Sequence, residues 1–216
     1  MMAYLSGVSG PLVREAAATD RIGLLVTPQS SLHRQIDRYR WWAADNAMFT
    51  DAVTEAEWVC WLATLPRGGC LFATAPDVVG EWKASWKRSR PWLRVIRDLG
   101  FPAALVAQDG MTVADLLRTA PEWDALFIGG STEWKEGQVV LDLIREAKRL
   151  GRHVHVGRVN SWRRLEHFAA AGVDTVDGTY LATAPDVNLP KLARWMRRLD
   201  SQPFLGSTES VAEDVA

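Results

Sequence analysis

Cysteine is scarce in this sequence, and its scarcity excludes two common ways of stabilising a protein. Only Cys60 and Cys70 occur among 216 residues, and we expect both to be small buried apolar residues on different elements. Neither lies in a CxxC pair or a Cys/His cluster, whereas a structural zinc site needs about four such ligands. We therefore expect no metal site, no disulfide framework and a reducing, cytoplasmic setting.

Long apolar runs are also missing. A membrane-spanning helix needs about 20 consecutive apolar residues, and no run in the sequence approaches that length. Residues 1–8 lack the basic start and the apolar core that are typical of a secretory signal. We expect neither a membrane partner nor secretion.

An excess of one charge sign is absent as well. The 25 basic and 26 acidic residues leave a formal net charge of -1, which argues against a purely electrostatic, histone-like binder of nucleic acid. A local basic face would still suffice to contact phosphates. A solvated helix face is the alternative interpretation of such residues. The basic residues that we expect to contact nucleic acid are Lys83, Lys87, Arg88, Arg90, Arg163 and Arg164.

The composition itself is that of an ordinary globular protein, with 48% hydrophobic and 24% charged residues. Short apolar runs alternate with amphipathic stretches, a pattern typical of parallel strands joined by helices. Expected strands lie at residues 3–8, 22–27, 40–44, 70–75, 103–107, 125–128, 153–156 and 175–176. Expected helices lie at residues 14–18, 54–65, 79–99, 112–118, 138–150, 161–171 and 189–199.

This alternation predicts a single α/β domain, a (β/α)8 TIM-type barrel over residues 1–200. A doubly wound open sheet is the alternative. We expect Pro91 to break or kink the helix at 79–99, and the polar stretch 29–40 to be a connection. Residues 201–216 are polar and acidic without apolar periodicity, so we expect a flexible tail there.

The active site of such a barrel lies at the carboxyl ends of its strands. The residues that follow each apolar run are therefore the candidates for function. Asp, Asn and Gly also favour loops and helix N-termini, so one segment alone is weak evidence of function. The convergence of all the segments on one rim is stronger evidence. The segments are Asp45-Asn46-Ala47-Met48-Phe49, Pro76-Asp77, Gln108-Asp109-Gly110, Gly129-Gly130-Ser131, Arg158 with Asn160, and Asp177-Gly178-Thr179-Tyr180.

Two carboxylates in one pocket can divide the chemical work. A desolvated carboxyl group with a raised pKa can act as general acid or base, while the other carboxylate stays ionised. Retaining glycosyl transfer uses such a pair, with one carboxylate attacking the anomeric carbon. Gln108 carries both a donor and an acceptor for a nucleobase edge. Gly129 and Gly130 would let backbone N–H groups approach a planar ligand closely.

Five segments, in order, resemble motifs of the tRNA-guanine transglycosylase superfamily and its phage and bacterial DNA 7-deazaguanine transglycosylase branch. The family's Asp-Ser-Gly-Gly-Phe-Gln corresponds to Asp45-Asn46-Ala47-Met48-Phe49-Thr50, and its base-recognition aspartate to Asp77. Its glutamine motif is similar to Val106-Ala107-Gln108-Asp109-Gly110. Its Gly-Gly-Leu-x-x-Gly-Glu is similar to Gly129-Gly130-Ser131-Thr132-Glu133-Trp134, and its Gly-x-Asp-x-Phe-Asp to Gly172-Val173-Asp174-Thr175-Val176-Asp177.

The resemblance implies base exchange at a guanine nucleotide. Asp177 would attack C1′ as the nucleophile, and Asp45 would protonate the departing base and deprotonate the incoming 7-deazaguanine. No cofactor is needed for this displacement. The substrate-binding residues that we expect on this basis are Asp77, Gln108, Gly129, Gly130, Asn46, Phe49, Arg158 and Asn160.

Two departures from the family pattern bear on the substrate. The family's Ser-Gly-Gly is Asn46-Ala47-Met48 here, and its Cys3His zinc subdomain, which helps to position tRNA, has no counterpart. We therefore expect a barrel without the zinc subdomain that acts on DNA rather than tRNA, as in the phage-encoded branch that works in the host cytoplasm. A tRNA transglycosylase, a hydrolytic nucleosidase or glycosidase, and a non-catalytic nucleic-acid-binding barrel remain alternatives.

Several aromatic residues carry no assigned chemistry. Most of the 11 tryptophans fall at helical spacings and are expected to pack helices onto the barrel, while Trp134 and the Trp41-Trp42 pair are candidates to stack on an extruded base. His153 and His155 share one strand. We expect only one of them to face the barrel interior, as a packed histidine.

Overall fold

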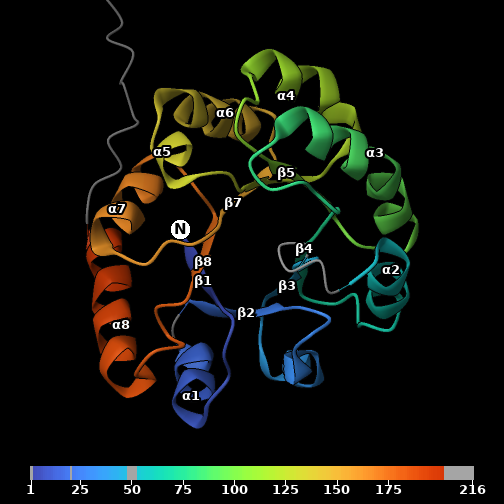
Figure 1. Ribbon diagram of the computed structural model, residues 1–216. Helices are drawn as coiled ribbons and strands as arrows, with labels where there is room; N and C mark the ends of the chain where they lie inside the picture. The colour runs from blue at the N-terminus through green and yellow to red at the C-terminus, as the bar shows by residue number, and fades with distance from the viewer. Residues whose placement is uncertain (1, 20, 48–52, 202–216) are drawn as a thin grey trace, which may run out of the picture.

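The computed structural model describes residues 2–19, 21–47 and 53–201. Parallel strands close into a barrel in sequence order, and the last strand pairs with the first (Figure 1). This topology confirms the (β/α)8 barrel and excludes the open sheet. The strands are β1 (Ala3–Ser6), β2 (Ile22–Val26), β3 (Trp42–Ala44), β4 (Cys70–Thr74), β5 (Ala103–Ala107), β6 (Ala125–Ile128), β7 (His153–Val156) and β8 (Thr175–Gly178).

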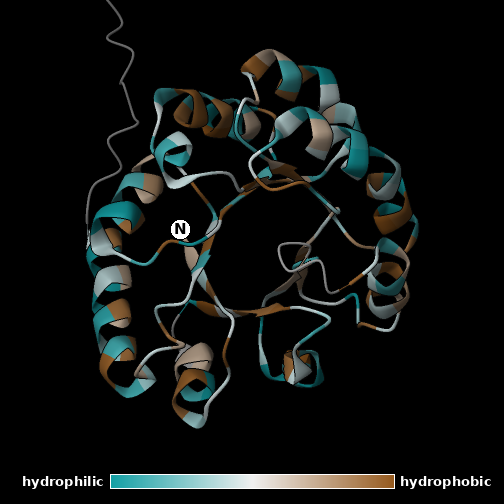
Figure 2. Cartoon of the chain, in the orientation of Figure 1, coloured by the Kyte–Doolittle hydropathy of each residue, from teal (hydrophilic) through white to brown (hydrophobic). Residues whose placement is uncertain are grey.

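Helices form an outer ring around this barrel (Figure 1). The helices carry both hydrophobic and hydrophilic residues (Figure 2), and their buried hydrophobic residues join the core beside the strands. They are α1 (Pro11–Thr19), the 3-10 helix η1 (Ser31–Arg38), α2 (Glu55–Ala63), α3 (Trp82–Asp98), α4 (Val113–Thr119), the 3-10 helix η3 (Ala120–Glu122), α5 (Thr132–Lys135), α6 (Gln138–Arg149), α7 (Trp162–Ala170) and α8 (Pro185–Ser201). No described helix is long and apolar enough to cross a membrane.

The core has two layers, as alternating side chains on barrel strands require. The larger layer lies between the strands and the helices. The smaller layer fills the barrel lumen, where Phe72 and Phe127 meet edge to face with centroids 6.1 Å apart. Small residues such as Ala43, Ala104 and Ala125 complete the lumen layer. The lumen is thus packed, and open space begins only above the carboxyl ends of the strands.

Tryptophans contribute to the outer layer as expected. Trp42, Trp58 and Trp123 are fully buried, and the Trp42 indole N–H donates to the Gly68 carbonyl at 2.9 Å. Burial of Trp42 overturns the expectation that it stacks on an extruded base. Trp134 is only partly buried, so it remains available for that role.

Local signals explain where several helices begin. Thr54 forms a capping box with Glu57 at the start of α2, and Thr112 forms one with Asp115 at the start of α4. The expectation that both cysteines are buried is wrong, because Cys60 on α2 is exposed and Cys70 is half-buried. Two elements were also not expected. The polar stretch 29–40 contains η1, which buries only Ile36, and α5 is a single turn too short to produce a periodic pattern.

Pro91 does not divide α3, although a proline inside a helix normally costs about 3 kcal/mol. The helix is continuous over its 17 residues. Its buried side chains lie on both sides of the proline, with Ser85 and Ser89 before it and Leu93 and Ile96 after it. The Ser89 hydroxyl also donates to the Pro76 carbonyl at 2.7 Å. Packing of both halves against the barrel therefore overrides the intrinsic preference.

The tail was expected over residues 201–216. Ser201 is the last residue of α8 and the last described residue, so the rest of the expected tail lies outside the described residues.

Gly23 in β2 offers a test of lumen packing. A Cβ atom at this position would lie 2.6 Å from Leu5 Cδ2 and 2.8 Å from the Trp41 carbonyl oxygen. We expect Gly23→Ala to lower the free energy of unfolding by about 1–3 kcal/mol, measured by denaturant titration. Gly68→Ala is the matched control, because a Cβ there meets nothing within 4 Å. Equal stabilities of the two variants would contradict the packing described here.

Candidate active site

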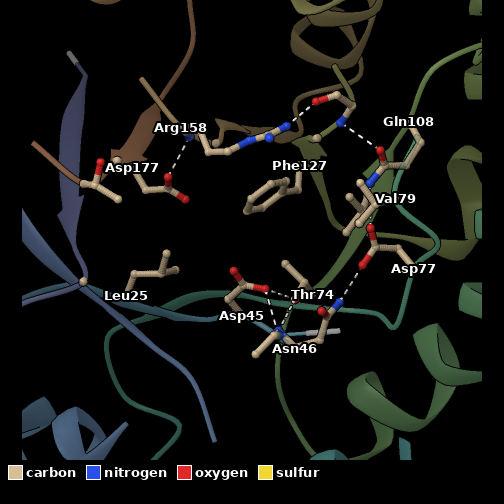
Figure 3. Close-up of a pocket in the computed structure, with 18 residues that line it drawn as sticks. Leu25, Asp45, Asn46, Thr74, Asp77, Val79, Gln108, Phe127, Arg158 and Asp177 are labelled. Carbon is tan, nitrogen blue, oxygen red and sulfur yellow. Dashed lines mark hydrogen bonds between the residues drawn. The ribbon is translucent and has the colours of Figure 1, made fainter. Parts of the chain in front are cut away.

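A cavity of about 360 Å³ opens above the carboxyl ends of the strands. Side chains from β2 to β8 and the loops that follow them form its walls (Figure 3). Of the 10 residues predicted for catalysis and substrate binding, the structure brings together eight here. These are Asp45, Asn46, Asp77, Gln108, Gly129, Gly130, Arg158 and Asp177.

Asp177 lies on β8, where the pairing of β8 with β1 places it opposite Leu5. Its carboxylate is held at both oxygens. Oδ1 accepts the backbone N–H of Arg158 at 2.7 Å, and Oδ2 lies 3.2 Å from Nε2 of His155. Only 8% of Asp177 is exposed, and its carboxylate points into the cavity (Figure 3).

Asp45 follows β3 and lines the cavity from a different wall than Asp177 does (Figure 3). Its Oδ1 accepts the Ala47 N–H at 3.2 Å and lies 3.5 Å from the Thr74 hydroxyl, which can donate to it. The pKa of Asp45 is raised to about 6, mainly by burial and in addition by the nearby carboxylate of Asp177. A carboxyl group with this pKa retains a protonated fraction near neutral pH, as a general acid requires.

Asp77, Asn46 and Gln108 form a connected buried group. Asp77 Oδ1 accepts from the Asn46 amide at 3.1 Å, and its Oδ2 accepts from the Gln108 amide at 2.6 Å. The Gln108 carbonyl in turn accepts the backbone N–H groups of Gly80 at 2.9 Å and Gly130 at 2.8 Å. Burial raises the pKa of Asp77, and the bonds from Asn46 and Gln108 oppose that rise. Gln108 thus orients Asp77 at the cavity wall.

Gly129 and Gly130 serve packing in this structure. The Gly129 N–H donates to the Ala107 carbonyl at 2.9 Å, and the Gly130 N–H is taken by Gln108. Their N–H groups therefore face the protein instead of the cavity. A Cβ at Gly129 would lie 2.8 Å from the Gln108 amide nitrogen, and one at Gly130 would lie 2.6 Å from Trp134. Gly129 thus leaves room for the Gln108 amide, and Gly130 leaves room for Trp134 and Asp109.

The β7–α7 loop holds the other predicted residues. Arg158 adopts a left-handed backbone with φ 62°, and its guanidinium donates to the Gly130 carbonyl across the cavity mouth (Figure 3). Asn160 is exposed and does not line the cavity; it packs against Gly178 instead. Phe49 lies outside the described residues.

Two buried residues near Asp177 were not predicted as part of the site. His155 is fully buried and contacts Asp177. Lys135 on α5 donates to the Gly157 carbonyl at 2.7 Å. Burial lowers the pKa of Lys135 to about 8, and the positive charge of Arg158 contributes to that shift.

The expectation that only one of the two histidines faces the interior is wrong. Residues two apart on a strand share a face, and both His153 and His155 contact the hydroxyl of Thr175. The spacing of His153 and His155, matched by that of Thr175 and Asp177 on the neighbouring strand, is the signal that could have identified this group.

The basic residues predicted to bind nucleic acid are mostly paired with carboxylates. Arg88 lies 2.7 Å from Glu55 and Arg90 lies 2.9 Å from Glu122, while Glu136 binds both Arg163 and Arg164. Lys83 and Lys87 are exposed on α3. These ion pairs reduce the local positive field, and contact with phosphates stays a prediction.

Within the described ranges, no three His, Cys, Asp or Glu side chains are grouped so that they could hold a metal ion.

No family model and no curated protein matches the chain significantly. Solved structures share its fold. A mutant tryptophan synthase alpha-subunit from Pyrococcus furiosus has a TM-score of 0.60 at 13% identity, covering 93% of this chain and 97% of that one. A structure described as "Native KDPGal structure" has a TM-score of 0.57 at 16% identity, covering 92% and 93%. Tryptophan synthase from M. tuberculosis has a TM-score of 0.55 at 14% identity, covering 92% and 90%. Identities this low show the barrel fold alone.

Asp45 makes the stability of the barrel depend on pH. Its pKa in the folded state is about 6, against an ordinary pKa of 3.8 for an aspartate, so the folded chain binds its proton more tightly than the unfolded chain does. This contribution to stability is fully present below about pH 4 and is lost as pH rises through about 6. We expect Asp45→Asn, which cannot ionise, to be more stable than the parent at pH 7 by up to roughly 3 kcal/mol.

Denaturant titrations at pH 7 and pH 4 test this expectation. The advantage of Asp45→Asn should shrink towards zero at pH 4. Asp98→Asn is the control, because the Asp98 side chain is 62% exposed and its charge is screened by solvent. A stability difference for Asp45→Asn that is the same at both pH values would show that Asp45 is not desolvated.

Proposed function

We propose that this protein is a base-exchange glycosyltransferase that replaces guanine in DNA with a 7-deazaguanine derivative. The observation that carries the proposal is the placement of Asp45 and Asp177 on two different walls of one cavity. Asp45 has a pKa of about 6, whereas Asp177 accepts the Arg158 N–H on one oxygen and contacts His155 with the other. Unequal environments of this kind assign the acid and the nucleophile of a carboxylate pair.

The exchange proceeds in two balanced displacements. Asp177 attacks C1′ of the target nucleotide, the bond from C1′ to the base breaks, and Asp45 gives its proton to the departing guanine. The incoming 7-deazaguanine then loses a proton to Asp45 and attacks C1′, which breaks the ester to Asp177. Both carboxyl groups return to their starting states, so the cycle needs no cofactor or co-reactant beyond the two bases.

Asp77 supplies the recognition of the base. Its carboxylate has about four acceptor sites, of which Asn46 and Gln108 occupy one on each oxygen. The remaining sites complement the adjacent N–H and NH2 donors on the guanine edge. Leu25, Val79 and Phe127 add apolar surface to the same cavity, which suits a planar ring.

The ordered motifs support this activity over the alternatives, because the resemblance assigns them to one active rim and their described residues follow β3, β4, β5 and β6 and end on β8. DNA is favoured over tRNA because the sequence lacks the Cys3His subdomain. The target nucleotide must leave the duplex stack to reach the cavity. Trp134 packs against Gly130 at the cavity wall and is the tryptophan best placed to contact an extruded base.

Incorporation of a labelled 7-deazaguanine into guanine-containing DNA tests the proposal. Asp177→Asn should lower the rate of incorporation by at least about a thousandfold, because loss of a nucleophile removes the covalent path. Asp142→Asn is the control, since Asp142 lies on α6 and pairs with Arg145; it should exchange at the parent rate.

Other outcomes are equally informative. Release of guanine without incorporation of the labelled base would identify a hydrolytic nucleosidase. Incorporation by Asp177→Asn at the parent rate would refute the nucleophile assignment.

A further inference from the structure

A chain of buried polar side chains runs through the barrel interior to Asp177, and the proposed reaction does not use it. Nε2 of His153 lies 2.8 Å from the Thr175 hydroxyl oxygen. Nδ1 of His155 lies 2.9 Å from the same oxygen, and Nε2 of His155 lies 3.2 Å from Oδ2 of Asp177. Strands β7 and β8 pair with His155 opposite Thr175, so the register of two neighbouring strands builds the chain.

For a neutral His155, the number of protons available decides the direction of these bonds. Thr175 has one hydroxyl proton, so it donates to one histidine and accepts from the other. If Thr175 donated to His153, then His155 would use its Nδ1 proton on Thr175 and turn the bare lone pair of Nε2 towards the Asp177 carboxylate, which is repulsive. In the other arrangement, His153 donates to Thr175, Thr175 donates to Nδ1 of His155, and Nε2–H of His155 donates to Asp177. Each of the three contacts then joins a donor to an acceptor.

The surroundings of His155 leave it little freedom to move. The ring is fully buried, and its centroid lies 5.0 Å from that of Phe72 and 4.6 Å from that of Phe127. Burial lowers the pKa of His153 to about 4, against the attraction of Asp174. His153 therefore stays uncharged at neutral pH and can act as the donor at the start of the chain.

We propose that His155 is a positioning residue, which accepts from Thr175 at Nδ1 and donates from Nε2 to Oδ2 of Asp177, so that the nucleophile is oriented for attack. The proposal rests on the proposed function, because it assigns a role for Asp177. The backbone N–H of Arg158 holds the other oxygen. Two rigid donors on two different oxygens prevent rotation of the carboxylate, and the remaining lone pairs face the cavity.

A pair of substitutions at His155 separates positioning from packing. The amide nitrogen of glutamine lies about as far along the side chain as Nε2, so His155→Gln can still donate to Asp177. Asparagine reaches only as far as Nδ1, so His155→Asn can contact Thr175 but not Asp177. We expect His155→Asn to lower the kcat of base exchange about ten- to a hundredfold, the worth of a hydrogen bond to a charged group. KM should change little, and His155→Gln should restore most of kcat.

His33→Gln is the control, because His33 lies on η1 and contacts Ser30 and Trp61 outside the cavity. Thermal unfolding of each variant shows whether it is folded at the assay temperature. Equal kcat values for His155→Asn and the parent enzyme would overturn the proposal. So would a His155→Gln variant that is folded and as impaired as His155→Asn, because packing alone would then explain both losses.

The tautomer of His155 can be measured in the unmodified chain without any activity. Two-bond ¹H–¹⁵N correlation spectra at pH 7 should show its proton on Nε2 and none on Nδ1, with the signal assigned by its loss in His155→Gln. A proton on Nδ1 would overturn the proposal even if base exchange occurs. If the parent chain shows no exchange, the proposed function fails, while the tautomer still decides whether His155 donates to Asp177.

Discussion

The pairing of β8 with β1 is the constraint on which the site depends. Parallel strands in a closed barrel direct all their carboxyl ends to one rim, and closure places Asp177, near the end of the chain, beside Leu5 on the first strand. Asp45 reaches the same cavity from β3. Residues separated by more than half of the sequence therefore share one cavity because the sheet has no edge. An open sheet of the same strands would separate them.

The cavity places three carboxyl groups in a partly desolvated space, and their hydrogen bonds make them different. Asp177 accepts the Arg158 N–H on one oxygen, and Nε2 of His155 lies against the other. Asp77 receives two amide donors. Asp45 has a backbone N–H and a more distant hydroxyl, and its pKa is raised to about 6. One group is thus suited to proton transfer, while two are held as oriented acceptors. The cost of burying Asp45 reduces stability at neutral pH, as is common where a site requires a strained or desolvated group.

The sequence predicts the barrel well because each strand is a short apolar run bounded by polar residues. β5, β6 and β7 have the expected bounds. It fails where an element is too short or too polar to show periodicity, as in α5 and η1. At Pro91, where a break or a kink was expected, α3 continues without a break. The predicted rim residues mostly line the cavity because the fold itself determines where strands end.

Partners, in contrast, depend on strand register and side-chain direction, which no single segment reveals. The role of Gln108 as a support for Asp77, the N–H groups of Gly129 and Gly130 turned into the protein, and the contact of His155 with Asp177 all arise between different strands. The same holds for the basic residues, since the ion pairs of Arg88 and Arg164 join separate helices and loops.

Mass spectrometry of the covalent intermediate tests directly whether Asp177 is the nucleophile. The chain would be mixed with a guanine-containing DNA oligonucleotide without any acceptor base, quenched in acid denaturant, and digested to peptides. We expect a nucleotide adduct on the peptide that contains Asp177, and none on the peptides that contain the other carboxylates of the cavity. An adduct on Asp45, on Asp77 or on Lys135, or loss of guanine with no adduct at all, would contradict it.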